Sequence, residues 1–426
     1  MTPAAVRRIV RVPVGALRAG EGSVVKVALT HLRAEGEALV CAEGLEETGI
    51  TLPSLTTDVL CIGSTLFAHR STRKSVTRLD NNRTYLIGEG LLRIARCPAA
   101  AGDVTFFALC EGALYQLSSV GISTTKFEPA PTTSNVVLHH ERLFGGADER
   151  MEYTAPLDFS SWTKYSEQGA GWCRMSSQCG AIVDVVTLRD RVYFLREHGI
   201  TRFTGYSDVY NFRLDEMAFP FGSILSRAAV IGEEAYFFTS AGLCRFDGSG
   251  VRRAEGAADE DIDLAQPARV DAAQGKLLAA SVKKKDGTSA VYLYDPVAQR
   301  GRYLGHAFES FSAGDEMYLI SGGTLFRVTG QALPQGGTCC MKTQFSLTSL
   351  GQGEKRTEAV FVRGTGTFTA QLCGEDGARS VQGRAGEWLD FAAGVRGESV
   401  TLTLTCADED VRIEEIALRV RREDRV

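Results

Sequence analysis

The adjacent histidines His139 and His140 are the side chains in the sequence most able to bind a metal ion. Glu141 and Asp148 follow shortly after them, and imidazole nitrogens and carboxylate oxygens are common zinc ligands. Neighbouring residues of a strand point to opposite faces of a sheet, so the two imidazoles are not expected to share one ion. The sequence therefore predicts hydrogen bonding between neighbouring sheets for this pair, and no metal site.

Cysteines are the second group able to do chemistry. Cys173 and Cys179 are separated by five residues, and Cys339 is adjacent to Cys340; neither spacing is that of a zinc knuckle. No sequence feature places a general base beside a thiol, as a nucleophilic cysteine requires. The total of 11 is odd, and several cysteines lie among apolar residues of predicted strands (Cys61, Cys110, Cys244, Cys406). We expect buried free thiols in a reducing compartment.

Within the acidic segment 254–269, four of the five acidic residues lie close together and offer oxygen ligands to calcium: Asp259, Glu260, Asp261 and Asp263. The segment lacks the glycine and the final glutamate of a helix-loop-helix calcium loop. A solvated loop is therefore the prediction for it.

Three aromatic residues, Trp162, Tyr165 and Trp172, fall in the segment 156–180, which we expect to be a long loop between repeats. Exposed aromatic rings stack on sugars or anchor a protein partner, whereas loop rings also pack against their own sheet. The sequence leaves both alternatives open. We take the three residues as candidate contacts for a protein or a surface glycan.

Apolar landmarks recur along the middle of the chain at steps of roughly 40 to 50 residues. Residues 186–205 (VTLRDRVYFLREHGITRFTG) predict a hairpin with a strand at 191–198, a turn at His198 and Gly199, and a returning strand at 200–204. The corresponding landmark positions are Leu66, Phe107, Phe144, Tyr193, Tyr236, Leu278 and Tyr318.

Such spacing is typical of β-propeller blades, because blades packed side by side bury the faces that one four-stranded sheet leaves open. We predict an all-β fold with a seven-bladed β-propeller over residues 56–335; unrelated hairpins in a β-sandwich are the alternative. Residues 1–55 lack the repeat and form either a docking element or a strand that closes the ring. Residues 336–426 alternate apolar and polar side chains and predict a small C-terminal β-sandwich.

Composition narrows the classes of function. The 426 residues carry 47 Lys and Arg against 52 Asp and Glu, a net charge of -5 that argues against general binding to DNA or RNA. No apolar run is long enough for a membrane span, and we expect no signal peptide. A propeller glycoside hydrolase needs paired carboxylates at one mouth, but no motif marks such a pair, and the repeat signatures of sialidases, WD40 and kelch proteins are absent. The sequence predicts no catalytic residue and no cofactor.

Two long stretches resemble the propeller proteins of tailed bacteriophages and prophages. They are RLFGGADERMEYTAPLDFSSWTKY with VDVVTLRDRVYFLREHGITRFTG, and the later MKTQFSLTSLGQGEKRTEAVFVRGTGTFTAQL. The residues that match the family pattern are Arg142, Leu143, Phe144, Pro156, Asp158, Phe159, Trp162, Leu188, Phe194 and Phe203. The likeness extends over about 130–426, whereas the amino-terminal part lacks the asparagine-rich strand with which the family usually begins.

The resemblance implies a non-catalytic structural protein of the virion, similar to tail-nozzle, tail-tip, head-completion or stabilisation proteins. It implies a homo-oligomeric ring around the tail axis, other tail or connector proteins as partners, and DNA only as passing cargo. The protein would then be in the host cytoplasm during assembly and in the virion afterwards. A carbohydrate-binding or cell-surface-binding propeller is the alternative function, and a propeller glycoside hydrolase is a lower one.

Overall fold

The computed structural model describes residues 6–14, 17, 23–35, 37–42, 44–98, 104–117, 124–127, 133, 135–162, 169–205, 209–266, 268–330, 338–408 and 410–423. These residues form β-strands and short 3-10 turns, with no α-helix among them. No helix in the described part is long and apolar enough to cross a membrane. The prediction of an all-β fold is confirmed.

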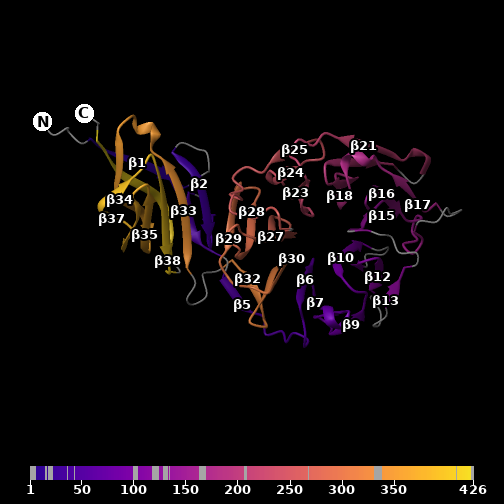
Figure 1. Cartoon of the computed structure of the whole chain (residues 1–426). Helices are drawn as coiled ribbons and strands as arrows, with labels where there is room; N and C mark the ends of the chain where they lie inside the picture. Colours follow the sequence, from indigo (N-terminus) through magenta and orange to yellow (C-terminus); the bar gives the residue numbers. More distant parts are fainter. Residues whose placement is uncertain are drawn as a thin grey trace.

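Sheets of four antiparallel strands follow one another around a ring in sequence order (Figure 1). The first three sheets are β6 (Asp58–Ile62), β7 (Thr65–Arg70), β8 (Ser75–Arg78) and β9 (Arg83–Leu86); β10 (Leu91–Pro98), β11 (Val104–Cys110), β12 (Ala113–Leu117) and β13 (Thr124–Lys126); and β14 (Val137–His139), β15 (Arg142–Ala147), β16 (Arg150–Tyr153) and β17 (Gly171–Arg174). The next two are β18 (Ile182–Leu188), β19 (Arg191–Arg196), β20 (Gly199–Thr204) and β21 (Arg213–Met217), and β22 (Ala229–Ile231), β23 (Glu234–Thr239), β24 (Gly242–Phe246) and β25 (Val251–Arg253).

Two further groups of four strands complete the ring. One is β26 (Arg269–Ala273), β27 (Leu277–Lys283), β28 (Ser289–Asp295) and β29 (Arg300–Leu304), which belongs to a longer nine-stranded sheet. The other is β30 (Ser310–Ala313), β31 (Met317–Ser321) and β32 (Thr324–Thr329), joined by β5 (Gly44–Glu47) from the start of the chain.

Every landmark of the sequence repeat lies in the second strand of one of these groups, from Leu66 in β7 to Tyr318 in β31. The second strand has a hydrogen-bonded neighbour on each side and another sheet against its faces. Its side chains are therefore the most buried, as Phe107, Tyr193 and Tyr236 show with 2% exposure or less. One shared cluster packs Tyr193 and Leu195 of β19 with Phe237 of β23 and Phe246 of β24, so adjacent sheets are held together by core residues.

The ring is closed by a strand that precedes it in sequence. Leu45 of β5 lies opposite Val328 of β32, and the Arg327 guanidinium lies 2.6 Å from the Glu46 carboxylate. This pairing is one of the two roles that the sequence left open for residues 1–55.

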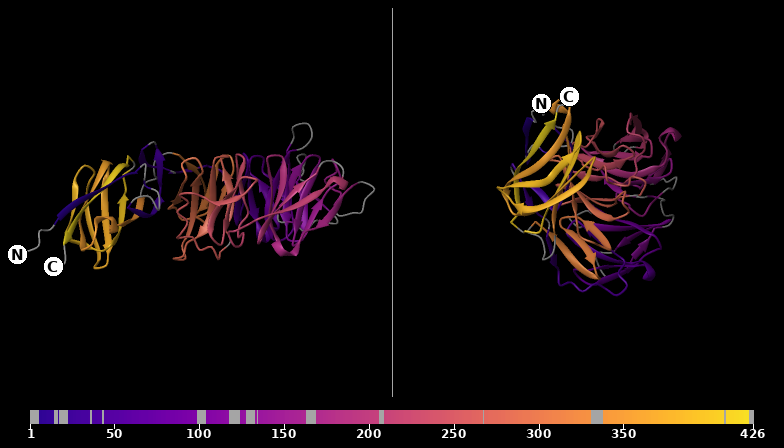
Figure 2. Two further views of the ribbon diagram at one scale, coloured as in Figure 1. Left: turned by 90° about the horizontal axis from the view of Figure 1, so that it is seen from above. Right: turned by 60° about the vertical axis from the view of Figure 1, so that its left-hand side comes forward.

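Both ends of the chain build a second, smaller part of the molecule, which we call the terminal unit. One of its sheets contains β1 (Val6–Pro13), β3 (Leu32–Glu35), β4 (Ala38–Cys41), β34 (Glu354–Thr365), β37 (Trp388–Arg396) and β39 (Arg412–Glu423). The other contains β2 (Val24–Thr30), β33 (Cys339–Ser346), β35 (Thr367–Gly374), β36 (Gly377–Arg384) and β38 (Ser399–Cys406), and continues through β2 into β29 of the ring. Figure 2 shows this unit as a block beside the ring, with both chain ends on its far side.

One hydrophobic cluster fills the space between these two sheets. It includes Phe345, Leu372 and Leu402 from one sheet and Val360 and Leu418 from the other, all at most 1% exposed. The alternation of apolar and polar residues in 336–426 predicts which side chains of these strands face the core. It did not indicate that β1 to β4 would join these same sheets.

The segment 156–180 differs from the prediction of a loop between repeats. It contains β17, which pairs with β16 as the fourth strand of its own sheet. The short strand Gly171–Arg174 has no long apolar alternation, because it lies at the sheet edge, and this is why its pattern was not visible in the sequence.

Replacing Leu45 by Asp tests the closure of the ring. Leu45 packs against the cluster of Leu319 and Val328, so a carboxylate there loses apolar burial and lies beside apolar side chains. We expect the free energy of unfolding to fall by about 3 kcal/mol in urea titrations. The exposed neighbour Glu47→Ala is the matched control and should change it by less than about 0.5 kcal/mol. Equal effects of the two substitutions would show that β5 is not needed for closure.

His31 lies at the junction of the ring and the terminal unit and predicts a pH dependence of stability. Its Nε2 accepts a hydrogen bond from Gly305 N at 2.8 Å, and burial and the adjacent His306 ring lower the pKa of His31 to about 4. The unfolded chain takes up a proton below pH 6.5, whereas folded His31 does not until about pH 4. Stability is therefore full above pH 6.5 and is lost as the pH falls towards 4.

We expect His31 alone to lower the free energy of unfolding by about 2 kcal/mol between pH 7 and pH 5. Asn tolerates the left-handed backbone of this position, which has φ 53°, so His31→Asn is the suitable variant. Urea unfolding at both pH values should show a smaller pH dependence in the variant. An unchanged dependence would assign the effect to other groups.

Candidate functional site

The first strands of the ring surround an axial cavity of about 870 Å³. Its lining includes residues of β6, β10, β14, β18, β22, β26 and β30, so every group of four strands contributes. Most of the lining is apolar. The charged side chains that reach it are Arg93, Arg96, Arg227, Arg269, Asp58 and Asp271. Arginines thus outnumber carboxylates at the wall, and this cavity is not an acidic channel.

Arg269 connects three first strands on one side of the cavity. Its Nη1 lies 2.9 Å from the Asp58 carboxylate of β6, and its Nη2 donates to Ser312 Oγ of β30 at 2.9 Å. Asp271, on the same strand as Arg269, lies 3.5 Å from Nε. Ser310 and Ser312 in turn accept hydrogen bonds from the backbone amides of Val59 and Cys61. The guanidinium therefore acts as a brace between strands.

A second set of contacts crosses the cavity. Arg227, which precedes β22, donates to the carbonyl oxygen of Leu92 in β10 at 2.7 Å. Burial, with the nearby Arg93 charge, lowers the pKa of Arg227 to about 10. Arg93 also lies 3.4 Å from Asp184, which is fully buried and accepts the amide of Ala228 at 2.9 Å. These polar groups hold distant sheets at fixed positions.

The cavity carboxylates are therefore engaged in structural contacts. Asp58 and Asp271 both bond to Arg269, and a glycoside hydrolase would need one carboxyl acid and one carboxylate directed at a substrate. Within the described residues the cavity offers no such pair. In the acidic loop, Asp259 also has a structural role, because it is buried, makes a two-pronged ion pair with Arg253 at 2.9 Å and accepts a hydrogen bond from the amide of Leu243.

The three candidate aromatic residues have different positions. Trp162 is fully buried in the cluster of Phe107 and Leu143, and its Nε1 donates to the carbonyl of Phe159 at 2.9 Å. The expectation of a surface contact is therefore wrong for Trp162, because its ring fills the space between two sheets. Tyr165 lies outside the described residues. Trp172 on β17 is 41% exposed, with the Arg150 guanidinium 4.6 Å from its ring centre, and remains a candidate.

The structure brings together another aromatic group that the sequence did not indicate. On the outer face of the sheet of β1, β39, β34 and β37, a row across the strands pairs Ala417 with Phe361 and Phe361 with Trp388. The two rings lie 5.5 Å apart, and the Arg419 guanidinium lies 5.1 Å from the Trp388 ring centre. Ile9 of β1, opposite Arg419, is 50% exposed. We call this surface the arginine–tryptophan face.

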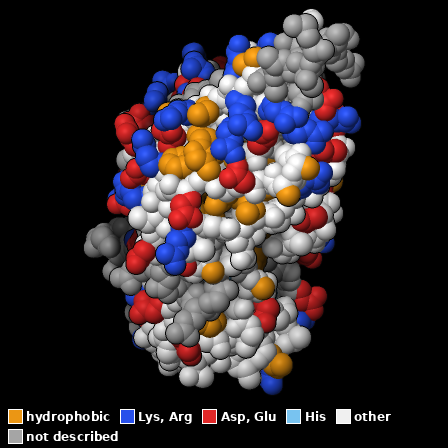
Figure 3. Space-filling model, turned by 90° about the vertical axis from the view of Figure 1, so that its left-hand side faces the viewer, with side chains coloured by type: hydrophobic (Ala, Val, Ile, Leu, Met, Phe, Trp, Pro, Cys, Tyr) orange, Lys and Arg blue, Asp and Glu red, His pale blue; other side chains and the backbone are white. Residues whose placement is uncertain are grey.

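Arginines are in excess on this face. Glu358 lies near Arg7, Arg419 and Arg421, with the shortest separation 3.1 Å from Arg7 Nε. Glu415 lies 3.4 Å from both Arg11 and Arg363. Figure 3 looks onto this side of the molecule, where hydrophobic side chains are surrounded by many Lys and Arg and fewer Asp and Glu. The alternating segment IALRVRR was the available sequence signal, but Phe361 and Trp388 come from other strands.

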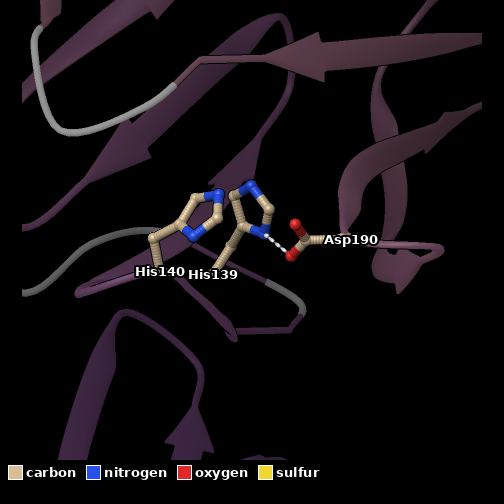
Figure 4. Close-up of side chains that lie close together, drawn as sticks. All are labelled: His139, His140 and Asp190. Atoms are coloured by element: carbon tan, nitrogen blue, oxygen red, sulfur yellow. Dashed lines mark ion pairs between the residues drawn. The ribbon is translucent and has the colours of Figure 1, made fainter.

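His139 and His140 are side by side, contrary to the prediction. His139 ends β14, and His140 is in the following turn with φ 49°, so the strand rule does not apply to it. The ring centres are 4.0 Å apart, and Asp190, from the turn between β18 and β19, lies 3.8 Å from His139 Nδ1 (Figure 4). Burial and the neighbouring His140 lower the pKa of His139 to about 4. Asp190 was not among the predicted residues, because it follows in a later sheet.

The cysteines agree with the expectation of free thiols. All 11 are unpaired by disulfides, and Cys61, Cys110, Cys244 and Cys406 are buried. Burial raises the pKa of the Cys61 and Cys97 thiols to about 12, which makes them poor nucleophiles.

Asp184→Ala tests the bracing of the cavity. The substitution leaves the amides of Val185 and Ala228 without an acceptor and Arg93 without its ion pair. We expect the free energy of unfolding to fall by about 3 kcal/mol in urea titrations. The control is Asp215→Ala, which removes a partly exposed ion pair with Arg202 and should cost less than about 1 kcal/mol. Similar losses in the two variants would contradict a bracing role.

No protein-family model matches the chain, and no curated protein matches its sequence. Among solved structures, it is similar to PorZ, a surface component of the type-IX secretion system of Porphyromonas gingivalis, at 10% identity and TM-score 0.42, over 83% of this chain and 52% of PorZ. It is also similar to puromycin hydrolase, at 11% identity and TM-score 0.40, over 87% and 60% of the two chains. A third is the WD40 domain of Pan2 from Neurospora crassa, at 7% identity and TM-score 0.41, over 70% and 97%. The chain thus spans about half of PorZ and three fifths of puromycin hydrolase.

Proposed function

We propose that the ring is a seven-bladed β-propeller and that the terminal unit is a β-sandwich. The support is the repeated four-stranded arrangement around one axis, with β5 as the fourth strand of the final blade. The domain boundaries then differ from a simple division of the sequence, since β1, β2, β3 and β4 belong with the carboxy-terminal strands. In this arrangement the propeller is a rigid body and the sandwich projects from one side of it.

The function that this architecture supports best is that of a non-catalytic structural subunit that assembles with copies of itself. The observation that carries it is the arginine–tryptophan face. Aromatic residues and arginine are enriched at protein interfaces, and Trp and Arg are frequent energetic anchors there. Here Ile9 is 50% exposed and Trp388 and Phe361 are partly exposed, and Arg7 and Arg11, each about two thirds exposed, form a polar rim.

The charge distribution selects a second copy of the chain as the occupant. The whole chain has a net charge of -5, whereas this face has more arginines than carboxylates. The rest of the molecule therefore carries a net negative charge, and this charge favours contact with the arginines of a second copy. A contact between two different surfaces of identical subunits is head-to-tail, and such contacts produce closed rings or open filaments.

The sequence resemblance to tail proteins of bacteriophages and prophages gives this assembly a context. A rigid propeller with a docking sandwich suits a ring around a tail conduit or at a tail tip, with other tail or connector proteins as further partners. None of the three solved structures named above is a phage protein, so this context depends on the sequence motifs alone.

Carbohydrate binding is the second candidate function, and exposed Trp172 favours it. The ring of Trp172 lies on an edge strand with Arg150 against it, a combination of aromatic surface and hydrogen-bond donors that suits a sugar. This site is on the ring and not on the terminal unit. The two functions therefore depend on different tryptophans.

Trp388, which is partly exposed, and Trp172, which is 41% exposed, give a matched test. We expect light scattering to show a discrete oligomer of the wild-type protein, and Trp388→Asp to shift it to monomer, because a carboxylate replaces an apolar anchor at the centre of the contact. Trp172→Asp should leave the mass unchanged. Raising the salt concentration should weaken the oligomer, since arginine contacts at the rim are screened.

Two outcomes would contradict assembly through the arginine–tryptophan face. A wild-type monomer at the concentrations used for assembly, or dissociation by Trp172→Asp alone, would contradict the docking face. Retention on a glycan array that is lost in Trp172→Asp and kept in Trp388→Asp would establish the carbohydrate-binding function instead. Circular dichroism of both variants should match the wild type, which excludes unfolding as the cause.

A further inference from the structure

The cluster of His139, His140 and Asp190 joins two neighbouring sheets of the ring. The histidines lie at the turn between β14 and β15, and Asp190 lies at the equivalent turn between β18 and β19. One ligand atom from each residue lies within 4.8 Å of the others. Figure 4 shows the two imidazoles next to each other, with the carboxylate facing His139.

Backbone conformation holds these side chains in place. His140, Arg189 and Asp190 all have positive φ, between 47° and 57°, which non-glycine residues adopt infrequently. Arg189 also forms an exposed ion pair of 2.9 Å with Glu233, which precedes β23 of the next sheet. The positions of the three residues therefore come from two constrained turns.

The donor set has a definite chemical preference. Two imidazole nitrogens and one carboxylate oxygen suit zinc and neighbouring divalent transition ions, whereas calcium and magnesium prefer sets made of oxygen. Two ligand atoms that are each about 2.0–2.2 Å from a zinc ion are roughly 3.5 Å from each other. The Asp190 carboxylate lies 3.8 Å from His139 Nδ1, and its side chain is 75% exposed, so it has room to move to this distance.

We propose that His139, His140 and Asp190 bind one divalent transition-metal ion of the zinc class and that the ion links the sheet β14 to β17 with the sheet β18 to β21. A cavity of about 390 Å³ beside the histidines, lined also by Glu141 and Arg142, provides space for water molecules that complete the coordination. Arg142 does not compete, because its guanidinium donates to the carbonyl oxygens of Thr154 and Gly169. This site is independent of the docking function proposed above.

The test uses cobalt as a spectroscopic probe on the full-length protein in a Cys373→Ser background. Cys373 is the most exposed cysteine, so its removal takes away the most accessible thiol, and the thiolate charge-transfer band reports binding by the partly exposed Cys41, Cys173 and Cys340. We expect one equivalent of Co²⁺ to give visible ligand-field bands without a thiolate charge-transfer band, and Zn²⁺ to displace it. Asp190→Asn and His140→Ala, both at exposed turns, should each weaken affinity by roughly tenfold or more.

His198→Ala is the matched control. His198 also follows a ring strand, but it contacts Ser223 and has no place in the cluster, so its removal should leave cobalt affinity unchanged. Zinc should raise the melting temperature of the control variant and not that of Asp190→Asn, because only an intact site couples binding to folding. Absence of stoichiometric binding, a thiolate band, or equal affinity in Asp190→Asn and His198→Ala would each overturn the proposal.

Discussion

The pairing of β5 with β32 is the interaction on which the rest of the ring depends. Glu46 and Arg327, which meet across it, are 281 residues apart in sequence, so this pairing joins the two ends of the propeller-like part. Without β5, the strands β30 to β32 would present an open edge where unpaired amides and carbonyls attract other strands. The entropy lost in closing so long a segment grows only with the logarithm of its length, so local packing of Leu45 and Val328 can offset it.

Ring closure also explains the charged groups inside the molecule. Burying a guanidinium and a carboxylate costs more than their attraction returns unless each is fully hydrogen-bonded. Arg269 meets that condition through Asp58, Asp271 and Ser312, and Asp184 meets it through backbone amides and Arg93. Apolar side chains at the axis would give stability without fixing which strands face each other. The ion pairs therefore favour one arrangement of the first strands. They act around the axial cavity, which keeps the sheets on its opposite sides apart.

The sequence predicted what depends on local pattern. The landmark positions from Leu66 to Tyr318 mark second strands, because burial on both faces requires apolar residues there. The alternation after residue 336 marks strands with one solvent-exposed face. It did not predict pairings between distant segments, such as β1 with β39 or β2 with β33, because many alternating strands fit one another equally well. The His139 cluster was missed for a related reason: a strand rule was applied to His140, which is in a turn, and Asp190 comes from another sheet.

The three tryptophans show how the same side chain takes different roles according to its place in the sheets. Trp162 follows β16 and turns inward, where its indole bonds to Phe159 and fills the space between two sheets. Trp172 lies on an edge strand of the ring. Trp388 begins β37 at the edge of its sheet, where its ring lies near Phe361 and Arg419 and is partly exposed. Composition counts these residues equally, but only the strand register separates core from contact. A partly exposed tryptophan that contacts arginine and phenylalanine loses little conformational freedom on binding, and this is the physical reason for the proposed subunit contact on the arginine–tryptophan face.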